Sequence, residues 1–347
     1  MNKLIKTLAG SFLALTLAQA PMQAHAQQVL LAVDTNANRV LTLSPSTGAI
    51  LNPSFILDAG SALTYDFQTP RAAIQVGNQI WVSDQSPNIN AIYRFDLAGA
   101  YVGKIGGNVA GGGLSNVRGM RVIGDTVYVV NQGTTNAAPG PALIRFDFNG
   151  NNLGSFSTSA VGGTVGLSPW DVVSYNGRLL VSDGTSRGLQ QYNLDGSYFG
   201  AFTAALNNIP QQMFVRANGN VLMSANGSTP NGSFGLYELN SAGAVVANWT
   251  NTPGLGVRGV YELSNGQYLI SEAGGSNAVR GLGTIDPQGA QSTTNFTLIA
   301  GNINGGWLSV AAIPEPSAVL LMAGGLAFVA LVRQRQRKHQ SQTRRSR

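Results

Sequence analysis

Residues 80–84, Ile80-Trp81-Val82-Ser83-Asp84, form an apolar run that ends in an aspartate, and residues 92–96, Ile92-Tyr93-Arg94-Phe95-Asp96, form a second such run. A Gly-Asn pair precedes the first run, and an Ala-Gly pair follows the second. Glycine-containing pairs between apolar strands favour tight hairpins, because the central residues of the turn adopt positive φ. With one further strand on either side, residues 70–103 predict four short antiparallel strands, which we name a to d in chain order.

This unit recurs along the chain, and self-similarity at a regular period is typical of repeat folds. The second copy runs to Asn149-Gly150 and the third to Asp195-Gly196, while the fourth and fifth begin near residues 210 and 257. Four strands in about 40–50 residues match the size of a β-propeller blade. One residue at the start of strand a marks each repeat. These markers, spaced 47, 52, 41 and 47 residues apart, are Arg71, Arg118, Trp170, Gln211 and Arg258.

The two ends of the repeat region complete one more unit. Residues 29–34 look like a strand b, and strands c and d follow them with no strand a before. Residues 306–311 look like a strand a, and Trp307 lies 49 residues after Arg258, in register. We expect this C-terminal strand to pair with the N-terminal three and close the ring, which leaves no long exposed sheet edge. The predicted fold is therefore all-β, a six-bladed β-propeller of four-stranded antiparallel blades. A seven-bladed ring would need another blade within residues 51–69, a segment too short for one.

The repeat resembles the NHL-like and gluconolactonase-like family of six-bladed propellers. The likeness covers about residues 29–313 and rests on three elements: the Pro-Arg or Pro-Trp start of strand a, the Val-Ser-Asp end of strand b, and the Phe-Asp-x-x-Gly step from c to d. Two copies depart from the pattern, with Ala225 at the acidic position and Glu238-Leu239-Asn240 in place of Phe-Asp. In a propeller strand a lines a central channel, and the d-to-a and b-to-c loops share one face.

Polar residues from the start of strand a and the end of strand b should meet at the mouth of this channel. Functional groups concentrate on loops above a rigid scaffold, and Trp, Arg and Asp suit a site for a carbohydrate or small molecule. The structural alternative is that the aspartates accept turn N–H bonds while the arginines pair beside them. The candidate ligand-binding residues are Arg71, Asp84, Arg118, Trp170, Asp183, Arg258, Glu272 and Trp307.

Two functional classes remain open. The first is a non-enzymatic surface protein whose propeller binds polysaccharide or protein, for which no cofactor is expected. The second, implied by the resemblance, is a calcium-dependent lactonase or hydrolase, with Glu272 and Asp183 as candidate members of its acidic set. Both histidines, His25 and His339, lie near the chain ends, and there is no cysteine. Residues 27–313 therefore cannot carry Ser-His-Asp or Cys-His catalysis, a histidine-dependent lyase site, or the usual zinc, copper and iron sites. Oxygen-ligand metals such as calcium stay open, and we assign no catalytic residue and no metal ligand.

The N-terminus reads as a secretory signal peptide. Lys3 and Lys6 precede an apolar stretch at residues 8–17, and the small residues Ala24 and Ala26 flank His25. A charged region, a short apolar region and an Ala-x-Ala site in this order predict export, with cleavage after Ala26. The alternative is a short buried helix. The predicted signal peptide is residues 1–26.

The C-terminus carries a second targeting signal. Residues 318–332 are an uninterrupted run of apolar residues and glycine, shorter than the roughly 20 residues of a comfortable membrane span. Two prolines precede the run, and a cluster of basic residues follows it, which favours a cytoplasmic end. These three elements resemble the bacterial PEP-CTERM sorting signal. The motif residues are Pro314, Glu315, Pro316, Arg333 and Arg335.

This resemblance implies processing by an exosortase, a membrane protease-transpeptidase, after passage through the Sec translocon. It also implies a Gram-negative bacterium that makes extracellular polysaccharide, a precursor held transiently in the inner membrane, and a final place at the cell surface or outside it. An ordinary tail anchor is the alternative. The predicted organisation is a signal peptide, a propeller at 27–313, a sorting signal at 314–338 with a short apolar helix, and a basic tail at 339–347.

The charge distribution argues against nucleic acid as a partner. The chain carries a net charge of +6, but only 12 of its 21 basic residues lie between Gln27 and Ala312, against 14 of its 15 acidic residues. The propeller is therefore slightly acidic, whereas a nucleic-acid-binding domain needs a basic footprint. The basic character of the whole chain belongs to its two ends.

Overall fold

The computed structural model describes residues 26–60, 65–158, 167–203, 205–206, 208–227, 235–250, 256–272, 281–290 and 295–314. Residues Gln27–Ile313 form one compact unit. Met1–Ala26 and Pro314–Arg347 make up a second unit, of which only Ala26 and Pro314 are described. The rest of the expected signal peptide and the expected C-terminal apolar helix therefore lie outside the described residues.

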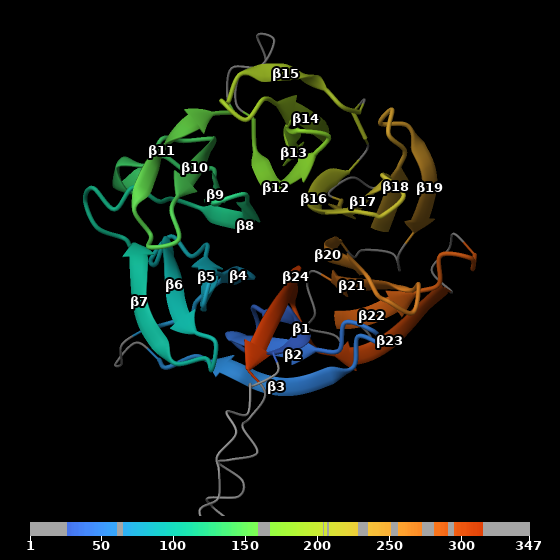
Figure 1. Ribbon diagram of the computed structural model, residues 1–347, viewed down its shortest axis with the longest axis horizontal. Coiled ribbons are helices and arrows are strands. Elements are labelled where there is room, and N and C mark those ends of the chain that lie inside the picture. The colour runs from blue at the N-terminus through green and yellow to red at the C-terminus, as the bar shows by residue number, and fades with distance from the viewer. Residues whose placement is uncertain are drawn as a thin grey trace, which may run out of the picture. The chain divides into compact units, whose positions relative to one another are not determined.

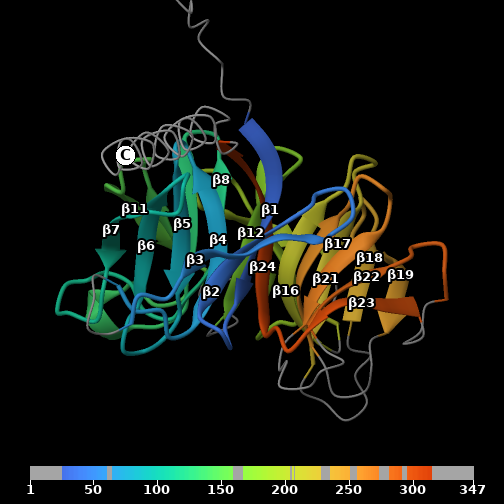
Figure 2. The same cartoon turned by 90° about the horizontal axis from the view of Figure 1, so that it is seen from below.

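Within the described part of the chain, six four-stranded sheets are arranged around a central axis (Figure 1). Neighbouring strands in these sheets run antiparallel where their register is defined. The six-bladed, all-β propeller expected from the sequence is confirmed. One strand of each sheet is innermost in Figure 1, and Figure 2 shows inner strands such as β4, β12 and β24 running through the ring.

The blades are numbered from the first one that is continuous in sequence. Blade 1 contains β4 (Pro70–Val76), β5 (Gln79–Asp84), β6 (Ala91–Asp96) and β7 (Tyr101–Gly106). Blade 2 contains β8 (Val117–Ile123), β9 (Thr126–Asn131), β10 (Ala142–Phe146) and β11 (Asn152–Ser157), with a short 3-10 helix η1 (Thr135–Ala137) after β9. Blade 3 contains β12 (Pro169–Tyr175), β13 (Arg178–Asp183), β14 (Gly188–Tyr192) and β15 (Tyr198–Ala201).

Blade 4 contains β16 (Ile209–Val215), β17 (Val221–Asn226), β18 (Gly235–Leu239) and β19 (Val245–Thr250). Blade 5 contains β20 (Val257–Glu262), β21 (Tyr268–Glu272), β22 (Gly281–Ile285) and β23 (Phe296–Gly301). Blade 6 combines the two ends of the unit, in the order β24 (Gly305–Pro314), β1 (Ala26–Asp34), β2 (Arg39–Leu43) and β3 (Ile50–Leu57).

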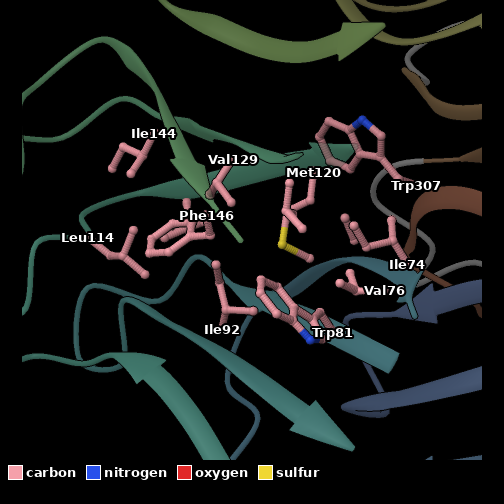
Figure 3. Close-up of a cluster of buried hydrophobic side chains, with 13 residues drawn as sticks. Ile74, Val76, Trp81, Ile92, Leu114, Met120, Val129, Ile144, Phe146 and Trp307 are labelled. Carbon is pink, nitrogen blue, oxygen red and sulfur yellow. The ribbon is translucent and has the colours of Figure 1, made fainter. Parts of the chain in front are cut away.

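The hydrophobic core lies between the blades. Six clusters of buried side chains occur in the described residues. Each joins two neighbouring blades, and the one between blades 1 and 2 also includes Trp307 of blade 6. Strand β5 shows why: Ile80 and Val82 pack toward blade 6, while Trp81 packs toward blade 2. Successive side chains of a strand point to opposite faces, so the middle of a strand b with a blade on each side is apolar at consecutive positions. Figure 3 shows the junction of blades 1 and 2, where Trp81 and Met120 lie in one cluster with Trp307.

The repeated motifs have structural roles in turns and between blades. In the Phe-Asp-x-x-Gly step, Asp96 accepts the backbone N–H groups of Ala98 and Ala100 at 2.9 and 2.8 Å, and Gly99 adopts a φ of 88°. The serine of the Val-Ser-Asp motif, or the serine at the same position of a divergent repeat, donates to a backbone carbonyl in the next blade. These inter-blade bonds run from Ser83 to Arg118 (2.9 Å), from Ser182 to Gln211 (2.7 Å), from Ser224 to Arg258 (2.6 Å) and from Ser271 to Gly306 (2.5 Å).

Candidate functional site

The repeat markers sit in β-bulges at the start of the inner strands. In blade 1, Pro70 pairs with Asp84 and Ala72 with Ser83, so Arg71 is the extra residue. Blades 2 to 5 show the same break in register at Arg118, Trp170, Gln211 and Arg258. A bulge redirects its side chain and increases the local twist. In blades 1 to 5 the marker is therefore the residue that a bulge redirects, which the sequence alone did not reveal.

We call the side of the ring that carries the d-to-a and b-to-c loops the loop face, and the side that carries the a-to-b and c-to-d turns the hairpin face. The markers lie where strand a begins, on the loop-face side of the channel. One of them, Trp170, meets the corresponding residue of blade 6, and Arg118 packs on Trp170. Trp170 of blade 3 stacks on Trp307 of β24, with ring centroids 6.3 Å apart and an interplanar angle of 14°. The guanidinium carbon of Arg118 lies 3.6 Å from the centroid of the Trp170 ring.

This arrangement changes the role expected for the tryptophans. Only 2% of the Trp307 side chain is exposed, because Trp307 belongs to the core between blades 1 and 2. Trp170 is partly exposed and already contacts both Arg118 and Trp307. Trp307 therefore has no open face on which a sugar can stack, and its ring contacts Trp170 of blade 3 instead.

Below this pair, side chains cross the channel. Asp171 accepts from Arg121 Nη2 at 3.1 Å and from the backbone N–H of Met213 at 2.9 Å, which joins blades 2, 3 and 4. Gln212 accepts the backbone N–H groups of Val260 and Leu308, each at 2.9 Å, which joins blades 4, 5 and 6. Burial raises the pKa of the Asp171 carboxyl, and the charge of Arg121 opposes part of this shift. A pocket of about 250 Å³ near the hairpin face is lined by Phe214, Tyr261 and other largely apolar side chains.

The aspartates at the ends of strands b hold their own loops. Asp84 accepts the backbone N–H groups of Gln68, Thr69 and Ser86 at 2.8, 3.1 and 2.9 Å. Asp183 accepts those of Ser168, Thr185 and Ser186 at 2.6, 3.2 and 2.8 Å. Burial raises the pKa of Asp84, while its backbone hydrogen bonds act in the opposite direction. Glu272 accepts the backbone N–H of Gly281 at 3.1 Å.

These acids do not converge. A calcium site needs six to eight oxygen ligands about 2.3–2.6 Å from one point. In the described ranges, no group of three or more Asp, Glu, His or Cys side chains is placed to hold a metal ion. Asp183 and Glu272, the candidate acidic pair of a lactonase, each bind backbone N–H groups of a loop in their own blade. The geometry therefore gives the calcium-dependent interpretation no support within the described part of the propeller.

A pocket of about 590 Å³ opens on the loop face between blades 1 and 2. Arg71, Gln85 and Asn116 contribute to its wall, together with the hydroxyl residues Ser86, Ser115, Thr134 and Thr135. Arg71 Nε donates to Gln85, Gln85 donates to Asn116, and Asn116 donates to Gln132. This chain of amides fixes the position of Arg71 at the junction of the two blades.

Sequence reasoning found Arg71 but missed the amides that hold it. Gln85 directly follows Asp84 at the end of β5, and Gln132 directly follows Asn131 at the end of β9. The two glutamines thus occupy the same position of the repeat in adjacent blades. That coincidence was visible in the sequence and is the signal that could have located the pocket.

Arg71 acts electrostatically on two other arginines at this mouth, Arg118 and Arg258. Burial, with a smaller contribution from the charge of Arg71, lowers the pKa of Arg118 and of Arg258 to about 9. Burial also lowers the pKa of Arg71 to about 10, against an opposing effect of Asp84. All three therefore remain cationic at neutral pH. The ion pairs found among the described residues are Arg39–Asp34, Arg121–Asp171, Arg216–Glu238 and Arg216–Glu262.

Residues 312–336 match the PEP-CTERM protein-sorting motif. The chain carries this sorting signal. It is therefore made as an exported, membrane-anchored precursor that is destined for the cell surface. Pro314, the first residue of the Pro-Glu-Pro triplet, is the last residue of β24, and the other motif residues lie outside the described part. The matched motif begins at Ala312, inside this strand, so the sorting signal starts within blade 6.

Among the residues that the structure describes, no helix has the length and apolar character needed to cross a membrane. The apolar run at 318–332 lies beyond them.

Solved structures share the fold of the unit at low sequence identity. A protein of unknown function from Bacteroides caccae is similar with a TM-score of 0.56 and 14% identity, over 82% of this chain and 98% of the other. A chain of the nidogen–laminin complex gives a TM-score of 0.52 and 11% identity, over 83% of this chain and 100% of the other. Virginiamycin B lyase from Staphylococcus aureus gives a TM-score of 0.44 and 13% identity, over 84% of this chain and 76% of the other. Comparison with curated proteins finds no match.

Proposed function

We propose that this protein is processed by an exosortase and displayed at the cell surface, where its propeller binds extracellular polysaccharide. The observation that supports binding is the pocket of about 590 Å³ between blades 1 and 2, which is lined by hydroxyl, amide and guanidinium groups. Sugar ligands present many hydroxyl groups, and such groups exchange hydrogen bonds with side chains of these types. The sorting signal supports this proposal, because a protein displayed at the cell surface can meet extracellular polysaccharide.

The pocket test is direct binding to a polysaccharide array by the full chain purified in detergent. We expect binding by the wild type and loss of it in Thr134→Trp, because Thr134 is an exposed residue of the pocket wall and a bulky ring there blocks entry. Asp125→Trp is the matched control, since Asp125 is exposed in the β8–β9 turn on the hairpin face. Equal binding by wild type and Thr134→Trp would contradict this site.

The sorting half of the proposal has its own test. Replacement of Pro314, Glu315 and Pro316 by alanine removes the triplet, and we expect the variant to accumulate as an uncleaved, membrane-bound precursor. Immunoblots of membrane and surface fractions measure the two forms. Pro314 is exposed at the end of β24, so its replacement leaves the blade junctions intact. An exposed-site variant such as Asp125→Ala should be processed normally, and normal processing of the triple variant would refute the assignment.

We also infer that pairing of β24 with β1 closes the ring. The order β24-β1-β2-β3 and the two core clusters on either side of blade 6 support this inference. Closure matters for function because it keeps blades 1 and 2, and hence the pocket, in a rigid frame.

A further inference from the structure

The mouth of the channel on the loop face carries positive charge that no ion pair among the described residues balances. Arg71, Arg118 and Arg258 come from blades 1, 2 and 5, yet none of them belongs to the four ion pairs found there. The nearby Asp84 and Asp183 act on Arg71 and Arg118 through space, but both carboxylates hold turn N–H groups instead. Arg71 repels both Arg118 and Arg258, and like charges held near one another favour an added anion.

Donors at this mouth also lack acceptors. Within the described residues, Nη1 of Arg71 and Nε of Arg118 are buried without a hydrogen-bond acceptor. A buried donor left unpaired is costly, and such groups in folded proteins call for an explanation. An oxyanion only accepts hydrogen bonds, and a guanidinium group offers five donors in a planar fork that suits it.

The arginines are held in place before any ligand arrives. Arg71 and Arg258 are bulge residues, and the carbonyl of Arg258 accepts from Ser224 of blade 4. Arg71 donates to Gln85, Arg258 donates to Asn304 Oδ1 at 2.7 Å, and Arg118 donates to the Pro169 carbonyl at 2.7 Å. A side chain that is already oriented loses little conformational freedom on binding.

From these observations we propose that the site takes an acidic sugar, whose carboxylate or sulfate group binds Arg71 at the wall of the pocket, with Arg118 and Arg258 supplying further positive charge. This inference rests on the proposed function and names the substrate class of the same site. The pocket accommodates the sugar ring and its hydroxyl groups, while the arginines select for the charged group. Neutral polysaccharides lack that group, so they bind more weakly.

The test is isothermal titration calorimetry on the full chain in detergent, with a galacturonic acid oligosaccharide and with its methyl ester. The ester has the same ring and linkage but no charge. We expect the acid to bind about 10-fold tighter or more, since a hydrogen bond to a charged group contributes strongly. Arg71→Gln should abolish this difference, and Arg71→Lys should keep part of it. Added salt should weaken the binding of the acid more than the binding of the ester.

Lys104→Gln is the control, because it removes the same charge from an exposed residue of β7, the outer strand of blade 1. Circular dichroism melts establish that each variant is folded, and Arg258→Gln provides a second variant. Equal affinity for acid and ester would overturn the acidic-sugar inference but leave polysaccharide binding standing. Absence of binding to either would overturn the proposed function as well. Inorganic sulfate that binds as tightly as the acidic oligosaccharide would also overturn the inference, because it would show a site for free anions.

Discussion

A chain that ends at Asn304 is expected not to fold, whereas a chain that ends at Pro314 keeps a cooperative unfolding transition. The shorter chain loses β24 and with it Trp307, Leu308 and Ala311, which are each at most 2% exposed. Loss of a large buried side chain costs about 2–5 kcal/mol, and a domain is stable by only about 5–15 kcal/mol. Loss of two such residues therefore removes most of the stability of the unit.

Three further effects add to this loss. Gln212 loses the backbone N–H and carbonyl of Leu308, its partners across the channel. Strand β1 becomes an exposed edge, which invites pairing with other chains. The two core clusters beside blade 6 lose part of their packing. Circular dichroism melts and size-exclusion chromatography of the two chains, each beginning at Gln27, measure the outcome. The same melting temperature for both chains would show that β24 does not hold the ring together.

Arg121→Met is expected to lower the free energy of unfolding by about 3–5 kcal/mol at neutral pH, the usual cost of removing one partner of a buried ion pair. The Asp171 side chain is 0% exposed, and Arg121 is the cation that balances it. Without Arg121, Asp171 either stays ionised with no cation to balance it or takes up a proton, and both cost free energy at neutral pH. Chemical denaturation of the variant and the wild type measures the difference.

The pH dependence of the stability loss in Arg121→Met identifies its cause. The pKa of Asp171 is raised in the folded state and rises further without Arg121, so the folded variant favours the protonated carboxyl. A raised pKa gives stability at low pH that is lost as the pH rises through it. The defect of Arg121→Met should therefore be smaller near about pH 4.5 than near about pH 7.

Two further variants test this second prediction. The double variant Arg121→Met/Asp171→Asn should be more stable than Arg121→Met at about pH 7, because the amide is neutral and still accepts from Met213. Lys104→Met removes a cation from an exposed site and should have little effect. A defect that does not vary with pH, or a double variant weaker than the single one, would rule out the buried charge as its cause.

The candidate site was only partly predictable. The sequence located Arg71, Arg118 and Arg258 by their place in the repeat, and the structure gathers their charges at one mouth. It could not show that Trp170 and Trp307 stack on each other, because that contact joins residues 137 positions apart on blades 3 and 6. It also assigned Asp84 and Asp183 both a binding and a structural role, and only the backbone of the loops shows which N–H groups they accept.

The sequence by itself determined the local pattern of strands and turns and the number of times that this pattern repeats. Apolar strands, glycine turns and the Val-Ser-Asp and Phe-Asp-x-x-Gly motifs act over a few residues, so six copies predict six blades, and the Pro-Glu-Pro triplet with its apolar run and arginines predicts sorting. Only the tertiary structure decided how the blades meet: the bulges at Arg71 and its equivalents, the serine bonds to the next blade, and the pocket between blades 1 and 2. These features depend on side chains that are distant in the chain and become neighbours only when the ring assembles, and no local spacing encodes that approach.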